Sequence, residues 1–162
     1  MSERGEFVIE EVRDLDAAWP ELEVLLRDSH EYYMPIVGYG PSPDWIEEVK
    51  ARFQPGAEAI LLLVRSTGKP VGFANAAVRT SPGEPPPRFV YIDNVYVLAE
   101  SRGSGIGTAI ARHLEAWARN QGVSEIRLDV FANNEVAVTF WRQFGFTERA
   151  FNLSKRITGV AS

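Results

Sequence analysis

Three glycines at alternate positions, directly after an arginine, are the part of this sequence best suited to chemistry. Gly103, Gly105 and Gly107 follow Arg102, between a strand-like apolar run and a helix-like run. Such a turn gathers unpaired backbone N–H groups at a helix start, where the helix dipole favours an anion. Glycine permits positive φ and lets the backbone approach phosphate oxygens closely. The turn is therefore an expected phosphate site, with the Arg102 guanidinium at its mouth to pair with a second phosphate.

Three other interpretations of this turn were weighed. A P-loop ends in Gly-Lys-Ser/Thr, and Gly107 is followed by threonine and alanine, so a P-loop is excluded. A nicotinamide dinucleotide fingerprint read from Gly105 has Ile110 where its third small residue belongs, although Asp129 stands at a suitable distance. It would also leave too little chain behind it for a two-half nucleotide fold. A turn without a ligand gives no reason for three glycines beside an arginine.

Composition narrows the function further. The 162 residues predict one domain, residues 1–162, with 45% hydrophobic and 24% charged residues. The absence of cysteine excludes disulfides and thiolate catalysis, and two histidines far apart in the chain predict no metal site. A net charge of −5 disfavours nucleic acid as a partner. The charged first residues and the lack of a membrane-length apolar run predict no membrane partner and a cytoplasmic location.

Hydrophobic periodicity predicts alternating strands and helices, and therefore an α/β or α+β fold with a mixed sheet. Apolar steps of three and four residues predict the helices, and runs of apolar or alternating residues predict the strands. The expected helices are residues 14–33, 45–53, 106–121 with Gly122 as the cap, and 133–144 with Gly145 as the stop. The expected strands are residues 7–12, 60–64, 71–78, 88–100 and 125–131, with one or two more in residues 147–157. The proline-rich residues 81–87 are expected to form an exposed loop.

The glycine turn and a second motif after it resemble one family. Residues 95–118 resemble the coenzyme A signature of the GCN5-related N-acetyltransferases (GNAT superfamily), Arg/Gln-x-x-Gly-x-Gly/Ala, with Arg102, Gly105 and Gly107 at its defining positions. Val97 stands where that family has the last apolar residue of its central strand. The downstream residues that match the family's second motif are Asn133, Ala137, Phe140, Gly145 and Phe146. The resemblance covers roughly residues 91–151, and the first half of the chain is compatible with it.

This resemblance implies a single domain with a twisted, mostly antiparallel sheet of six to seven strands and about four helices. It implies acetyl-CoA bound between the strand ending at Val97 and the strand of residues 125–131. Backbone groups would pair with the pantetheine arm and loop amides would hold the pyrophosphate. The cofactor-binding residues so implied are Val95, Val97, Arg102, Gly103, Ser104, Gly105, Ile106, Gly107, Thr108, Asn133 and Trp141.

The implied reaction is direct attack of a neutral amine on the acetyl carbon in a ternary complex. An alkylamine is mostly protonated near neutral pH, so a base must remove a proton, and Asp93 is the candidate, although a strand carboxylate can also be merely salt-bridged. Trp141 replaces the tyrosine with which the family often protonates the departing thiolate. Either Tyr96 or water replaces that acid, or none is needed because a thiol leaves readily. Trp141 could equally be a core residue.

The acceptor side is less defined by the sequence. His30, Glu31, Tyr32 and Tyr33 end the first expected helix, where the family builds its acceptor wall, and they are the candidate substrate-binding residues. Their other interpretation is aromatic cover for the core edge. The acidic balance suits a cationic small-molecule or peptide amine. A non-catalytic acyl-CoA sensor of the same fold is the alternative function, and a homodimer is expected because the last strands of such domains often pair across subunits.

Overall fold

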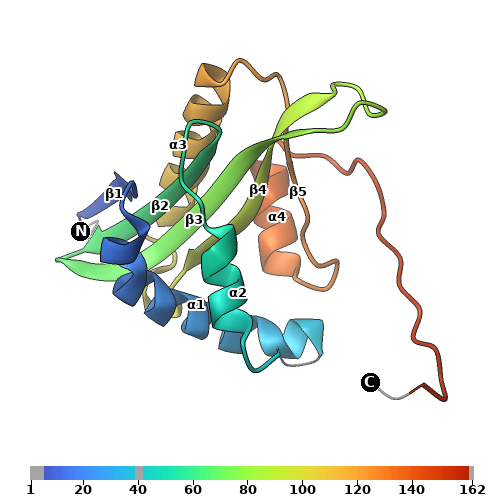
Figure 1. Cartoon of the computed structure of the whole chain (residues 1–162), viewed down its shortest axis with the longest axis horizontal. Coiled ribbons are helices and arrows are strands. Elements are labelled where there is room, and N and C mark those ends of the chain that lie inside the picture. Colours follow the sequence, from blue (N-terminus) through green and yellow to red (C-terminus); the bar gives the residue numbers. More distant parts are fainter. Residues whose placement is uncertain (1–5, 39–41, 161–162) are drawn as a thin grey trace.

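The computed structural model describes residues 6–38 and 42–160. Five strands form one sheet in the order β1-β2-β3-β4-β5, antiparallel except for the parallel β4–β5 pair (Figure 1). The strands are β1 (Phe7–Glu11), β2 (Ala59–Ser66), β3 (Lys69–Thr80), β4 (Arg88–Val97) and β5 (Ile126–Leu128). The helices are α1 (Leu15–Val37), α2 (Trp45–Arg52), α3 (Ile106–Asn120), α4 (Glu135–Gln143) and the 3₁₀ turn η1 (Ala99–Ser101). The predicted α+β class and the four α-helices are confirmed.

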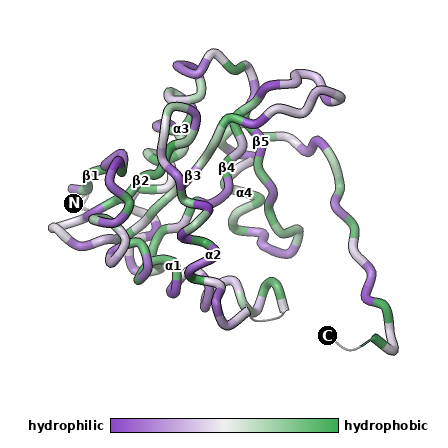
Figure 2. Tube along the Cα trace, viewed as in Figure 1, coloured by the Kyte–Doolittle hydropathy of each residue, from purple (hydrophilic) through white to green (hydrophobic). Residues whose placement is uncertain are grey.

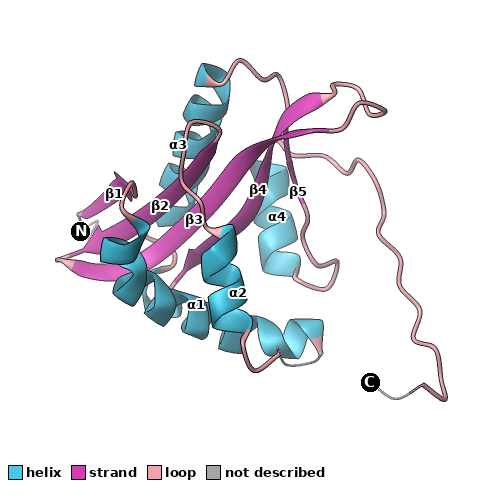
Figure 3. Ribbon diagram, in the orientation of Figure 1, coloured by secondary structure: helices cyan, strands magenta, loops and turns pink. Residues whose placement is uncertain are grey.

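The helices cover both faces of the sheet, as Figure 3 shows. On one face α3 and α4 pack on alternate residues of the central strands, among them Leu62, Ala74 and Ile92. On the other face α1 and α2 pack on the intervening residues, including Leu63 and Phe73. Because successive strand side chains point to opposite faces, apolar residues at nearly every position of β2 serve both cores. The apolar colour of the central strands in Figure 2 reflects this double burial.

Helix α1 is longer than the sequence predicted. It begins after Asp14, whose side chain accepts a hydrogen bond from the Ala17 N–H, and it continues through Pro35 to Val37. Gly38 ends it in a left-handed conformation and donates its N–H to the Met34 carbonyl. The extra turn at residues 34–37, expected as loop, extends the helix beside the sheet's α1 face. The rest of that expected loop includes residues 39–41, which lie outside the described residues.

A β-bulge interrupts the pairing of β3 with β4. Asn75 pairs with Asn94 and Ala76 pairs with Ile92, so Asp93 is an extra residue with no partner opposite it. Such an insertion shifts the alternation of side chains along the bulged strand. Ile92 therefore packs on the α3 side of the sheet, whereas Tyr96 packs on the α1 side.

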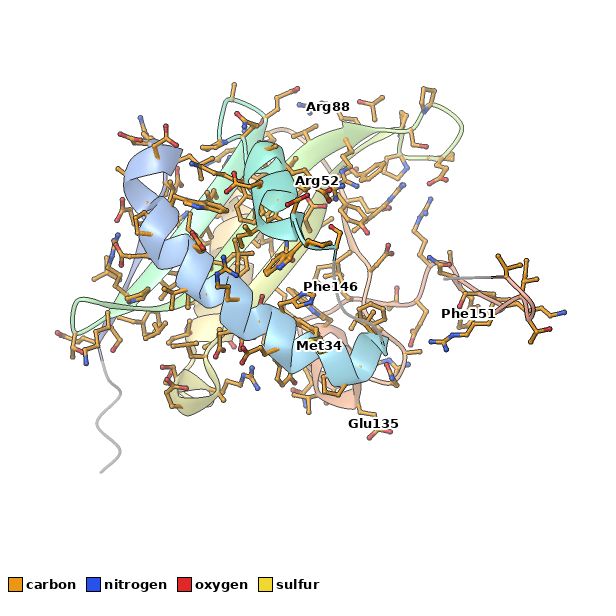
Figure 4. All side chains as sticks on the ribbon, turned by 60° about the horizontal axis from the view of Figure 1, so that its bottom comes forward. Met34, Arg52, Arg88, Glu135, Phe146 and Phe151 are labelled. Atoms are coloured by element: carbon orange, nitrogen blue, oxygen red, sulfur yellow. The ribbon has the colours of Figure 1, made fainter. Side chains whose placement is uncertain are left out.

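The expectation of six to seven strands was wrong in its count. Residues 147–157 form no strand, and the chain after Phe146 runs as an extended tail away from the body, where the side chain of Phe151 is labelled in Figure 4. Strand β5 is also shorter than the predicted residues 125–131. A strand needs a hydrogen-bonded neighbour. Residues 126–128 have one in β4, whereas residues 129–131 and the tail of residues 147–157 pair with no strand among the described residues.

Gly72 supplies a test of how closely β3 approaches β4. A Cβ on Gly72 would lie 2.8 Å from the backbone carbonyl oxygen of Tyr96, which cannot move without shifting β4. Gly72→Ala should therefore lower the free energy of unfolding by about 1–3 kcal/mol, measured by urea denaturation. Gly56→Ala is the matched control, because nothing lies within 4 Å of its Cβ position. Equal stability of the two variants would contradict the close approach.

Candidate functional site

Strands β4 and β5 separate where the bulge begins. They pair through Val90, Tyr91 and Ile92, and the pairing stops at Leu128. Within the described residues, the edge of β4 from Asp93 to Val97 therefore has no strand beside it. Backbone N–H and C=O groups on an open edge need partners, so this edge can pair with an extended ligand arm as an added strand would.

The glycine turn lies at the end of this open edge. The 3₁₀ turn η1 follows β4, and α3 begins at Ile106 with Gly105 as its N-cap. Gly103 has a φ of 80° and Gly105 a φ of 87°, both in the left-handed region that favours glycine. No side chain caps α3 and its first turn has no acidic residue. The first N–H groups of the helix thus remain available for an anion.

The space around the turn fits a bulky anion. A Cβ at Gly103 or at Gly105 would meet nothing within 4 Å, so the region in front of the loop is open. Behind the loop, a Cβ at Gly107 would lie 3.6 Å from the Phe140 ring of α4. The Ser104 hydroxyl donates to the Ser101 carbonyl, and Ile106 is buried in the core. These contacts fix the back of the loop and leave its front open.

Arg102 is exposed, and its side chain folds back over α1 and the end of β4. Its Nε donates to the Val97 carbonyl at 2.9 Å, and its guanidinium lies over the Tyr32 ring of α1, 4.3 Å from the ring centroid. The Tyr96 ring is 5.6 Å away on the same side. Arg102 therefore joins the mouth of the glycine turn to α1.

Asp93, the extra residue of the bulge, pairs with Arg79 of β3 at 2.5 Å. Burial raises the pKa of the Asp93 carboxyl, and Arg79 partly opposes this shift. The same Arg79 guanidinium lies 4.1 Å from the Tyr91 ring centroid. Burial and the neighbouring Asp129 carboxylate raise the pKa of Tyr91 to about 12. At the bulge, burial raises the pKa of the Asp93 carboxyl and Arg79 lowers it. Arg79 also contacts Tyr91, so it connects the two residues of β4.

Tyr96 is almost wholly buried and its hydroxyl donates to the Asp28 carboxylate of α1. Burial, together with this negative partner, raises the pKa of Tyr96 above its usual range. The phenol therefore keeps its proton at any ordinary pH and directs it toward Asp28.

Known proteins are similar to this chain in sequence and in fold. A profile of the acetyltransferase (GNAT) family matches residues 19–146. The chain belongs to this family. It is 30% identical over 93 residues to aminoglycoside N(6')-acetyltransferase type 1 of Klebsiella aerogenes, a match covering 57% of this chain and 61% of that protein. It is 39% identical over 77 residues to thialysine N-epsilon-acetyltransferase of Mus musculus, covering 46% of this chain and 45% of that protein.

Solved structures carry the same fold. A putative acetyltransferase from Pyrococcus furiosus superposes with a TM-score of 0.73 at 22% identity, covering 94% of this chain and all of that one. An aminoglycoside N-acetyltransferase in complex with CoA superposes with a TM-score of 0.75 at 19% identity, covering 98% and 99% of the two chains. At these identities the likeness concerns the fold alone.

Two residues implied by the GNAT resemblance lie elsewhere than at the open edge. The Asn133 side-chain amide donates to the Ile36 carbonyl of α1 at 3.3 Å, so it connects the β5–α4 loop to the end of α1. Trp141 is buried against Phe140 and Phe146, with ring centroids at 4.9 and 5.1 Å. The core interpretation of Trp141 fits these contacts.

The four residues expected on the acceptor wall are spread along the last turns of α1. Tyr32 and Tyr33 meet edge to face at 5.0 Å, and each approaches the Tyr96 ring, at 6.1 and 6.3 Å. The His30 ring lies against Trp45 at 4.7 Å, and its buried Nε2 has no hydrogen-bond partner in the part of the chain that the structure describes. Glu31 is exposed. The tyrosines thus gather beside Tyr96, whereas His30 contacts α2.

Sequence reasoning missed Asp28, Arg79 and Tyr91. Asp28 could have been found, since it precedes Tyr32 by four residues and shares its helix face. Arg79 could not, because the register that sets it beside Asp93 depends on the bulge. Among the described residues, no cluster of three or more potential metal ligands occurs, and no helix is both long and apolar enough to cross a membrane.

Proposed function

We propose that this chain is an N-acetyltransferase that moves the acetyl group of acetyl-CoA to a primary amine of a small molecule or peptide, by direct attack in a ternary complex. The observation that carries the proposal is the open β4 edge leading into the uncapped, left-handed glycine turn at the start of α3. The family and the CoA complex of a structural neighbour support it. Because the first relatives are matched over 61% and 45% of their lengths, the activity is argued from the site.

Acetyl-CoA supplies a thioester, an acetyl group activated for attack by nitrogen. The backbone amides of residues 103–108 would hold its pyrophosphate, and the groups of Val95 and Val97 would pair with its pantetheine arm. An amide near Val95 or Tyr96 would donate to the thioester carbonyl, where negative charge develops. Asn133 would either reach the pantetheine after releasing Ile36 or keep the next helix anchored to α1.

The acceptor would approach from the α1 side of the sheet. The Asp28 carboxylate lies on that side against Tyr96, and the exposed Glu31 follows it on α1, so the negative charge suits a cationic amine. The named relatives act on aminoglycosides and on thialysine, which supports a small, positively charged acceptor. The proposed acceptor wall consists of His30, Glu31, Tyr32 and Tyr33. The net charge of −5 argues against a nucleic-acid partner, and the proposed acceptor is a cytoplasmic amine.

Asp93 is the proposed general base, acting directly or through water. A base for an ammonium group works better as its pKa approaches the working pH, and burial shifts the pKa of Asp93 in that direction. Arg79 keeps the carboxylate oriented at the bulge and limits the shift. For the leaving thiolate, Tyr96 would first have to release Asp28, so departure with a proton from water, or none, is the simpler route.

The alternative is a non-catalytic acyl-CoA sensor with the same cofactor site, favoured by the buried Trp141 in place of a tyrosine. Thiol release separates the two functions. Wild-type protein should bind acetyl-CoA in calorimetry and release free thiol when amines such as kanamycin, lysine or spermidine are added. Binding without thiol release for any amine would favour the sensor, and no binding would overturn both.

Gly105→Glu should abolish acetyl-CoA binding while the domain stays folded, because the new carboxylate would stand in the open anion site. The matched control is Gly68→Glu in the β2–β3 turn, where φ is 77° and the space is equally open. Both substitutions put a side chain on a residue with left-handed φ, so they strain the backbone similarly. A difference in acetyl-CoA affinity between the two variants therefore comes from the glycine turn. Retained affinity in Gly105→Glu, with a normal melting curve, would rule out this loop.

Asp93→Asn should lower turnover about a hundredfold at pH 7. The turnover of this variant should partly recover at higher pH, where the amine loses its proton without a base. In the wild type, turnover should rise as the pH passes upward through the raised pKa of Asp93, since only the carboxylate accepts a proton. The measurement is kcat against pH for both proteins, with acetyl-CoA affinity as the control. Identical pH profiles would remove Asp93 as the base.

We also propose a homodimer in which the tail of one copy covers the open side of the other's β5. Phe151, Leu153, Ile157 and Val160 are each at least 71% exposed along the tail, and β5 is an edge strand. Exposed apolar residues in an extended segment, Phe151 and Leu153 two positions apart, favour pairing with a free strand edge. Light scattering should give twice the mass of one chain, and Phe151→Asp with Leu153→Asp should give monomers. A monomeric wild type at 100 μM would contradict the pairing.

A further inference from the structure

The acceptor wall and the cofactor loop share one physical contact. Tyr32, assigned above to the acceptor side, has its ring under the guanidinium of Arg102, the first residue of the glycine turn. Arg102 has no carboxylate within ion-pair distance among the described residues, and its interactions are the two aromatic rings and the Val97 carbonyl. The direction of this side chain is thus set by α1 and β4.

The aromatic surface under Arg102 is itself held in place. Tyr96 is 4% exposed and donates its hydroxyl to Asp28, one helical turn before Tyr32 on α1. The Tyr32 and Tyr96 rings lie 6.1 Å apart, inclined at 54°. Because Tyr96 is buried in the sheet and bonded to α1 through Asp28, its ring and the Tyr32 ring form a corner over which the planar guanidinium lies.

Holding Arg102 matters for the loop that follows it. A free arginine loses much rotamer freedom when it pairs with a phosphate, and that loss weakens binding. An arginine already held at the loop mouth has lost this freedom before the ligand arrives. Its Nε bond to the Val97 carbonyl also ties the side chain to the end of β4, where the pantetheine arm would begin.

We propose that Tyr32 is a positioning residue for coenzyme A, acting through Arg102 from the opposite wall of the site. The inference rests on the proposed cofactor site and goes beyond it by assigning to an acceptor-wall tyrosine a role in cofactor affinity. It uses the ring of Tyr32 and not its hydroxyl, because the stacked face holds the guanidinium.

The test is calorimetric titration with free coenzyme A, so that no turnover is needed. Tyr32→Leu should raise the coenzyme A Kd by about three- to tenfold, whereas Tyr32→Phe, which keeps the ring, should stay within about twofold of the wild type. Circular dichroism melting of each variant shows whether α1 remains folded.

A double-mutant cycle isolates the route through Arg102. Tyr32→Leu introduced into Arg102→Ala should cost no further affinity, because the group that Tyr32 positions is already gone. Equal costs of Tyr32→Leu with and without Arg102 would overturn the inference, as would an unchanged Kd in Tyr32→Leu. If the wild type itself does not bind coenzyme A, the proposed function falls and the inference with it.

Discussion

The separation of β4 from β5 is the constraint on which the rest of this molecule depends. Parallel pairing stops after Ile92 and Leu128, and the bulge at Asp93 begins at the same level of the sheet. From there on β4 keeps β3 on one side and leaves its other edge open. The open edge leads directly into η1 and the glycine turn, so one interruption of hydrogen bonding aligns an extended binding edge with a helix N-terminus.

The bulge also divides the chemistry between the two faces of the sheet. If the same residues of β4 paired regularly, with no bulge, Tyr96 would stand four residues after Ile92, share its face and point toward α3. With it, Tyr96 points to α1, where it meets Asp28, Tyr32 and Tyr33. The face toward α3 and α4 stays apolar and close-packed, with Trp141 in its core. Tyr96, Asp28 and the two α1 tyrosines therefore lie together on the α1 face, beside the open edge that leads to the glycine turn.

Arg102 links these two regions in a way that neither region explains alone. A cation at the mouth of an anion site is expected from electrostatics. Its contacts with the rings of Tyr32 on α1 and Tyr96 on β4 connect the glycine turn to the aromatic residues of α1. Under the function proposed above, this contact would let the occupancy of one region change the affinity of the other, with a reciprocal effect.

The sequence by itself determined the local features, because each depends on residues close together in the chain. The glycine turn after Arg102, the β2–β3 hairpin at Gly68 and the amphipathic helix α3 were all predictable in this way. Tertiary structure decided what depends on register and partners. Arg79 reaches Asp93 only through the bulged pairing, and Asn133 contacts Ile36, which lies 97 residues earlier in the chain. The tail after Phe146 forms no strand, since no edge in its own chain pairs with it. A one-residue shift in pairing moves every side chain to the other face, and no short-range pattern encodes that shift.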